Sequence, residues 1–175
     1  MRNIFIGLLF VFLNFNINMG NSSIGLIPTF IGYIYIGKGL IELAEQSEWF
    51  TRLKTYAAGM AIYSGIIYVM DLIGISKAMG TMSAMLLGLV STVFSLYISY
   101  GIIMGVKDIE AANQWELNSI SLFSTWKVLA LCSILGYLLL IIPMVGFISI
   151  ILGIIVSICF LYSFSKTKNM YYNQT

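Results

Sequence analysis

The sequence predicts an all-α membrane protein in which the chain forms one bundle of about six transmembrane helices. Two observations predict this class. Hydrophobic residues make up 59% of the chain and charged residues only 9%, whereas soluble domains are about 25% charged. The apolar residues also lie in long runs that short polar stretches separate. A soluble fold needs more polar surface than this, so the surplus apolar side chains are expected to face lipid.

Composition also argues against several kinds of partner and cofactor. The net charge of +2 is too small to indicate nucleic-acid binding. Histidine, the commonest general base and metal ligand, is absent from the sequence. Cys132 and Cys159 lie in apolar runs, where a thiol acts as a small hydrophobic side chain. We therefore expect no metal, no cofactor and no nucleic acid, and a lipid bilayer as the main partner.

The apolar runs give the expected helices, because a helix needs about 20 apolar residues to cross a bilayer. They cover residues 4–19, 24–43, 57–73, 82–105, 127–142 and 147–164, and a polar tail follows at 165–175. Pro28 falls in the first turns of the second helix, where its missing amide does least harm. Pro143 and Gly146 predict a tight hairpin between the last two helices.

The first segment has two interpretations. Arg2 followed by a short apolar run is typical of a cleaved signal peptide, but no small-x-small cleavage site follows. A retained span is favoured, and it reaches full length only if Asn14, Asn16 and Asn18 enter the membrane. On a helix Asn14 and Asn18 share a face. They would form hydrogen bonds between helices or line a solute path.

The basic residues predict the orientation of the bundle. Loops between successive spans alternate sides, which leaves only Lys77 on one side and gathers on the other Arg2, Arg52, Lys54, Lys107, Lys127, Lys166 and Lys168. By the positive-inside rule, the side with many basic residues is cytoplasmic. Both termini are therefore expected in the cytoplasm, with the bundle in the cell membrane.

Five side chains are expected at the membrane–water interface. Lys38 and Glu42 are four residues apart near the end of the second span, so both can extend to the interface. Trp49, Trp115 and Trp126 stand among charged residues in the polar connections. Aromatic rings beside basic residues favour the headgroup region.

Small residues mark candidate faces for helix packing. Ala57, Ala61 and Gly65 recur at intervals of four in the third span, and Gly32 leaves similar room in the second. Such seams allow another helix to approach closely. We predict that the seam carries association with a partner or with a second copy.

Polar residues within the spans mark a candidate path for a solute or ion. They are Asn14, Asn18, Asp71, Ser91, Ser95 and Ser99. Helix packing is the alternative role for the serines, and an exposed carboxylate at a helix end is the alternative for Asp71.

A short motif lies at the start of the second span. Phe15 and Asn16 precede it, and residues 28–33 read PTFIGY. This region resembles the opening part of small uncharacterised multi-pass membrane proteins of Gram-positive bacteria, in which a Pro-Asp-Phe-Ile-Gly-Tyr string enters the second span. The resemblance covers about a third of the chain. It implies a bacterial cytoplasmic membrane and no particular activity. Thr29 stands where that pattern has an acid, so no role of the carboxylate carries over.

The chain also contains a faint internal repeat. At a constant offset of 66, Gly39, Leu40, Glu42, Leu43 and Trp49 match Gly105, Val106, Asp108, Ile109 and Trp115. We interpret this as a duplicated helical hairpin, with spans two and three equivalent to spans four and five. Shared chemistry at the membrane exit is the alternative explanation.

The sequence favours a function other than catalysis. It contains no glycine-rich phosphate loop, no zinc pattern and no nucleophile elbow. Asp71 has no acidic partner within a span, as intramembrane aspartyl chemistry would need. We therefore predict an accessory, sensor or assembly subunit that acts through helix packing. The alternative is a small, oligomeric transporter or channel unit for an ion or small solute.

Overall fold

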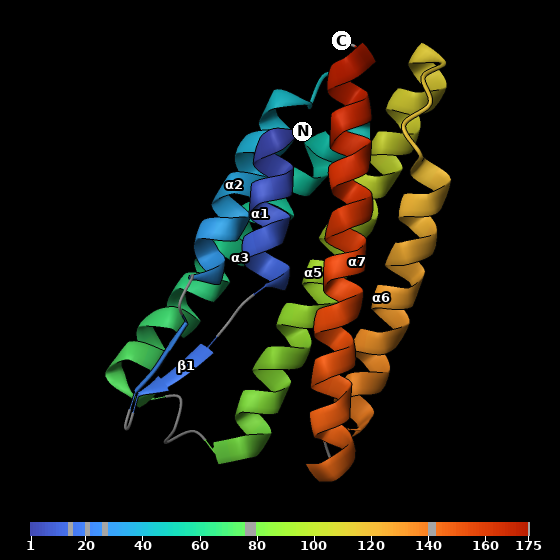
Figure 1. Ribbon diagram of the computed structural model, residues 1–175. Helices are drawn as coiled ribbons and strands as arrows, with labels where there is room; N and C mark the ends of the chain where they lie inside the picture. The colour runs from blue at the N-terminus through green and yellow to red at the C-terminus, as the bar shows by residue number, and fades with distance from the viewer. Residues whose placement is uncertain (14–15, 20–21, 26–27, 76–79, 140–142, 175) are drawn as a thin grey trace.

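Six helices form an elongated bundle (Figure 1) in the computed structural model, which describes residues 1–13, 16–19, 22–25, 28–75, 80–139 and 143–174. The helices are α1 (Arg2–Phe12), α2 (Thr29–Glu42), α3 (Glu48–Ile73), α5 (Gly80–Asn113), α6 (Ser119–Leu139) and α7 (Pro143–Gln174). A short antiparallel hairpin of β1 (Asn16–Met19) and β2 (Ser22–Gly25) lies between α1 and α2. The predicted all-α bundle is therefore confirmed, with this hairpin as a small addition.

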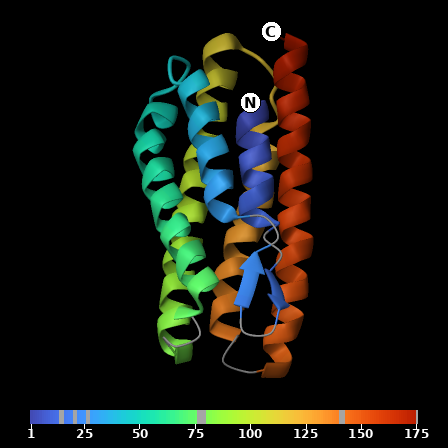
Figure 2. The same ribbon diagram turned by 90° about the vertical axis from the view of Figure 1, so that its left-hand side faces the viewer.

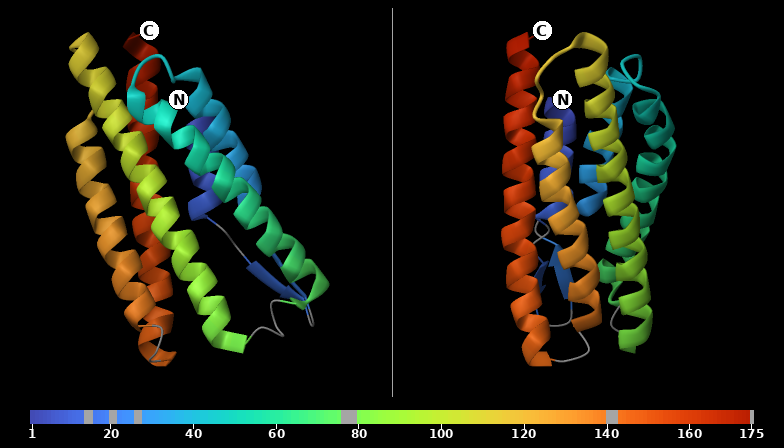
Figure 3. Two further views of the ribbon diagram at one scale, coloured as in Figure 1. Left: turned by 180° about the vertical axis from the view of Figure 1, so that it is seen from behind. Right: turned by 90° about the vertical axis from the view of Figure 1, so that its right-hand side faces the viewer.

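Both termini lie at the same end of the bundle, which we call the terminal end (Figures 1 and 2). α1 runs away from this end and α2 returns to it (Figure 2). The β-hairpin lies beyond these two short helices, toward the opposite end of the bundle. α3, α5, α6 and α7 then run in alternating directions along the bundle (Figure 3). The α2–α3 and α5–α6 connections consequently meet the termini at the terminal end.

Within the described residues, four helices are long and apolar enough to cross a membrane. The qualifying stretches are Glu48–Ile73, Met85–Asn113, Ser119–Gly136 and Ile151–Gln174. They present exposed apolar side chains outward, including Ile62 on α3, Leu86 on α5, Leu131 on α6 and Ile155 on α7. This apolar belt indicates a membrane location, because water would not favour such a surface.

The first two predicted spans differ from the structure. Residues 4–19 were expected to form one helix, but α1 ends at Phe12 and β1 follows it. Residues 24–43 likewise contain β2 before α2 begins at Thr29. At 11 and 14 residues, α1 and α2 are about 16 Å and 21 Å long. Both helices are therefore shorter than the roughly 30 Å apolar core of a bilayer. Asn and Ser are residue types that favour turns over helix interiors, which accounts for the end of α1 before this polar stretch.

The longer helices extend beyond their predicted spans at the terminal end. α3 begins at Glu48 rather than at residue 57, so Trp49, which was expected in a polar connection, lies in its first turn. α5 continues to Asn113 rather than ending at 105, and α6 begins at Ser119 rather than 127. The predicted polar tail is the last part of α7. Polar helix turns therefore project past the apolar belt.

Glycines allow α1 and α2 to pack closely. A Cβ atom on Gly7 would lie 2.5 Å from the carbonyl oxygen of Gly32, and one on Gly39 would lie 2.5 Å from the Ile4 side chain. Real Cβ atoms do not approach other atoms so closely, so these positions require glycine. The two short helices thus form one unit, with Leu8 buried.

The predicted repeat has one structural parallel and one difference. Gly39 and its equivalent Gly105 are both buried, and a Cβ atom on Gly105 would collide with the ring of Phe50. However, α2 ends at Glu42, whereas α5 continues past the equivalent Asp108. The duplication stays a prediction.

Candidate functional site

The charged residues described by the structure gather toward the terminal end. The basic ones are Arg2, Lys38, Arg52, Lys54, Lys107, Lys127, Lys166 and Lys168, and each lies in the half of its helix nearer that end. Six acids share this end: Glu42, Glu45, Glu48, Asp108, Glu110 and Glu116. Asp71 lies near the opposite end of α3. We call residues 1–3, 42–48, 107–118 and 166–174 the polar cap.

Hydrogen bonds fasten the α2–α3 connection to the rest of the polar cap. Ser47 is the N-cap of α3, and its Oγ accepts a hydrogen bond from the Trp49 amide at 3.2 Å. The same hydroxyl donates to the Asp108 carboxylate on α5. Next to it, the Gln46 amide nitrogen donates to the Tyr171 hydroxyl on α7 at 2.9 Å. The start of α3 is thereby joined to the ends of α5 and α7.

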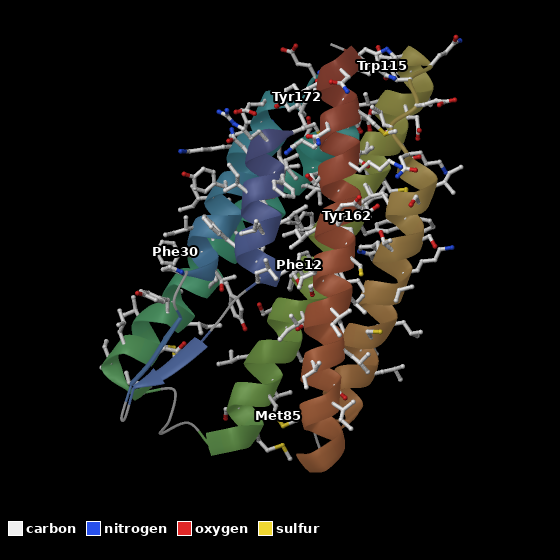
Figure 4. All side chains as sticks on the ribbon, in the orientation of Figure 1. Phe12, Phe30, Met85, Trp115, Tyr162 and Tyr172 are labelled. Carbon is white, nitrogen blue, oxygen red and sulfur yellow. The ribbon has the colours of Figure 1, made fainter. Side chains whose placement is uncertain are left out.

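The termini join the same network. The Arg2 amide donates to the Tyr172 hydroxyl at 3.2 Å, and the Asn3 side chain donates to Glu42. Burial lowers the pKa of the Met1 amino group, an effect that Glu42 opposes and Arg2 reinforces. The first and last helices are therefore tied together at the terminal end, where Figure 4 shows Tyr172.

The α5–α6 connection is held by a hydrogen bond between two of its own residues and by a ring contact with α7. The carboxylate of Glu110 accepts a hydrogen bond from the Leu117 amide at 2.9 Å. Trp115 packs edge-on against Tyr171, with ring centres 5.9 Å apart. Figure 4 shows Trp115 at the terminal end of the bundle. This predicted interfacial tryptophan therefore also anchors the connection to α7.

An aromatic cluster joins α3, α5 and α6 just below the polar cap. The Tyr100 ring lies 6.0 Å from Trp49 and 5.1 Å from Trp126, and Phe123 stacks on Trp126. The Lys127 ammonium lies 4.6 Å from the centre of the Phe123 ring. Aromatic rings beside a cation are typical of the headgroup region of a membrane. Tyr100 thus contacts both Trp49 and Trp126, two of the predicted interfacial tryptophans.

The three serines of the predicted path all lie on α5 and differ in burial. Ser99 is fully buried; its hydroxyl donates to the Leu96 carbonyl and accepts a hydrogen bond from the Trp126 indole, both at 3.0 Å. Ser95 donates to the Thr92 carbonyl of its own helix at 2.9 Å. Ser91, one turn away, is half-buried.

The other described residues of the predicted path, Asp71 and Asn18, lie on elements other than α5. Asp71 is half-buried in the last turn of α3, and its carbonyl accepts a hydrogen bond from Gly74. Asn18 lies in β1, paired in register with Ser23, so it belongs to a strand and not to the predicted helix. Asn14 lies outside the described residues. The helical spacing that placed Asn14 and Asn18 on one face therefore does not apply.

The small-residue seam of α3 packs mostly within the chain. Ala57 is fully buried, and Ala61 is half-buried against the core. Gly65 faces Phe30 of α2, and a Cβ atom there would lie 3.9 Å from the Phe30 Cβ. Only the Gly65 end opens outward, into an apolar groove of about 610 Å³.

The PTFIGY motif forms the start of α2. Pro28 is its N-cap residue, and the Phe30 ring lies 5.6 Å from Tyr68 of α3. Gly32 contacts α1, and the Tyr33 side chain is almost completely buried. At the other end of α2, the exposed Lys38 lies 5.7 Å from the centre of the Tyr35 ring. The motif therefore has a packing role in this fold.

Sequence reasoning did not single out three of the residues that assemble the polar cap. Ser47, Gln46 and Tyr171 are joined by contacts between distant parts of the chain. Only Ser47 carries a local signal, since a serine before Glu and Trp at a helix start is a typical N-cap.

Comparison with protein families, with curated proteins and with solved structures found no match to this chain.

Proposed function

We propose that the chain is a multi-pass protein of a bacterial cytoplasmic membrane that serves as a non-enzymatic accessory or assembly subunit. The apolar belt on four helices supports the membrane location. The gathering of basic residues at the terminal end supports a cytoplasmic polar cap by the positive-inside rule. Both termini are then cytoplasmic.

The observation that carries the accessory function is the state of the serine hydroxyls in α5. Ser95 bonds to its own helix, and Ser99 is held by Trp126 and Leu96. A solute path needs polar groups that can exchange their partners for the solute. Ser99 is fully buried and Ser95 donates to its own helix, and this supports a helix-packing role for these two serines over a transport role.

The groove around Gly65 is the surface we assign to that packing. Its walls include Phe30, Ile62, Tyr68 and Val69, and it holds about 610 Å³. A glycine lets a partner helix approach closely, which is a common basis of helix association in membranes. Because Ala57 is buried inside the chain, the contact is centred on Gly65 rather than on the whole predicted seam. The proposed occupant is a transmembrane helix of a partner membrane protein.

Purification in a mild detergent, followed by identification of the co-purifying proteins, tests this function. Gly65→Leu fills the groove and is expected to abolish co-purification of the partner. Gly153→Leu on α7 is the matched control, because a Cβ atom there meets nothing within 4 Å. Unchanged co-purification with Gly65→Leu would overturn the assignment, as would solute-selective flux through the purified protein in liposomes. A homo-oligomer dissolved by Gly65→Leu would instead identify a second copy as the partner.

A further inference from the structure

One groove in the polar cap brings together two cations from opposite ends of the chain. It has a volume of about 450 Å³ and is lined by Arg2, Asn3, Glu42, Lys168 and Tyr172. These residues belong to the start of α1, the end of α2 and the end of α7. The groove therefore exists only when the termini are docked on each other.

The groove contains two cations, Arg2 and Lys168, and one acid, Glu42. Within the described ranges, the one salt bridge joins Arg52 to Glu48, and it includes neither Arg2 nor Lys168. The Glu42 carboxylate accepts a hydrogen bond from Asn3. Two like charges in one groove repel each other, and an anion bound between them offsets that repulsion.

The groove offers donors that suit a phosphate. The Arg2 guanidinium can donate two parallel hydrogen bonds to phosphate oxygens. The Lys168 ammonium lies 4.6 Å from the centre of the Phe5 ring, a contact that holds it in place. Tyr172 accepts from the Arg2 amide, which leaves its own proton for donation. The groove also adjoins the N-terminus of α1, where no side chain caps the helix.

The position of the groove along α7 matches the headgroup layer of a membrane. The continuous apolar belt of α7 ends at Tyr162, which is 76% exposed. Lys168 is six residues closer to the terminal end, a rise of about 9 Å along the helix. Figure 4 shows Tyr162 between Tyr172 and the apolar half of the bundle. Lipid phosphates lie just outside the apolar core of a bilayer, at about this height.

From these observations we infer that the groove binds the phosphate of an anionic phospholipid headgroup. Basic pockets between membrane helices bind such headgroups through charge and hydrogen bonds. The inference rests on the proposed membrane location, but it does not depend on the accessory function. Membrane fractionation of the same samples reports on the location separately.

Native mass spectrometry of the purified full chain in a neutral detergent tests the site. Phosphatidylglycerol and phosphatidylcholine are added separately, and the retained lipid is measured. The wild type is expected to retain phosphatidylglycerol about tenfold better. Arg2→Gln or Lys168→Gln is expected to lower that retention about tenfold. Glu42→Gln is expected to raise it about threefold, because it removes a negative charge.

Lys166→Gln is the matched control, since Lys166 is an exposed cation on α7 outside the groove, and it is expected to retain the lipid as the wild type does. If Lys168→Gln does not fold by circular dichroism, Lys168→Arg keeps the charge and is expected to retain binding. Equal retention of the two lipids by the wild type would overturn the site, as would unchanged retention in both glutamine variants. Displacement of phosphatidylglycerol by an equal concentration of inorganic phosphate would overturn the assignment to a lipid.

Discussion

The hydroxyl of Ser47 donates a hydrogen bond to the carboxylate of Asp108, a residue 61 positions further along the chain. Ser47 is the N-cap residue of α3, and Asp108 lies near the end of α5. One side chain thus caps a helix and ties two helices together at the terminal end. The polar cap is held by contacts of this kind, which bring its separate segments into one surface.

Replacing Ser47 with Ala is expected to lower the free energy of unfolding by about 1 kcal/mol, because it removes the N-cap and the bond to Asp108. Thermal unfolding in detergent, followed by circular dichroism, measures the effect. Ser124→Ala, at an exposed position of α6, serves as the control and is expected to unfold at the wild-type temperature. Equal stability of the two variants would show that this bond does not support the polar cap.

Replacing Gly7 with Ala is expected to separate α1 from α2. The new Cβ atom would lie 2.5 Å from the Gly32 carbonyl oxygen, and relief of such overlap costs about 1–3 kcal/mol. Gly37→Ala is the matched control on α2, because a Cβ atom there meets nothing within 4 Å. Unfolding in increasing concentrations of sodium dodecyl sulfate should distinguish the two variants. A Gly7→Ala protein as resistant as the wild type would contradict the close packing of these helices.

Trp126→Phe is expected to destabilise the bundle by about 1 kcal/mol, because it removes the indole donor to the buried Ser99 hydroxyl. Ser99→Ala removes the other partner. A double-mutant cycle measured by thermal unfolding should therefore show coupling between the two positions. Strict additivity would mean that this hydrogen bond contributes nothing to stability.

The sequence predicted the class of the fold and the positions of the charges because both depend on composition and on local runs of residues. It was wrong to extend the first helix through residues 16–19, which form β1, because the mostly apolar composition before them favours a continued span. The asparagines in that stretch carried the opposing signal. The turn around Pro143 is only partly described, and Pro143 itself begins α7.

Contacts between residues far apart in the chain could not be predicted from the sequence. Gly32 was expected to allow close helix packing and lies against Gly7, but no local pattern indicates that Gly7 is its partner. Ser99 and Trp126 were assigned to separate roles, whereas the structure joins them by a hydrogen bond. The groove at Arg2 and Lys168 likewise depends on the two termini meeting.

Two-sided cysteine labelling most directly tests the claim that the polar cap lies on one side of the membrane and carries both termini. In a background with Cys132→Ala and Cys159→Ala, single cysteines replace Arg2, Glu45, Lys77 or Gln174, and a membrane-impermeant maleimide is applied to intact cells and to inverted vesicles. We predict labelling at positions 2, 45 and 174 only in inverted vesicles, and at 77 only in intact cells. Labelling of positions 2 and 174 from opposite sides would contradict the account.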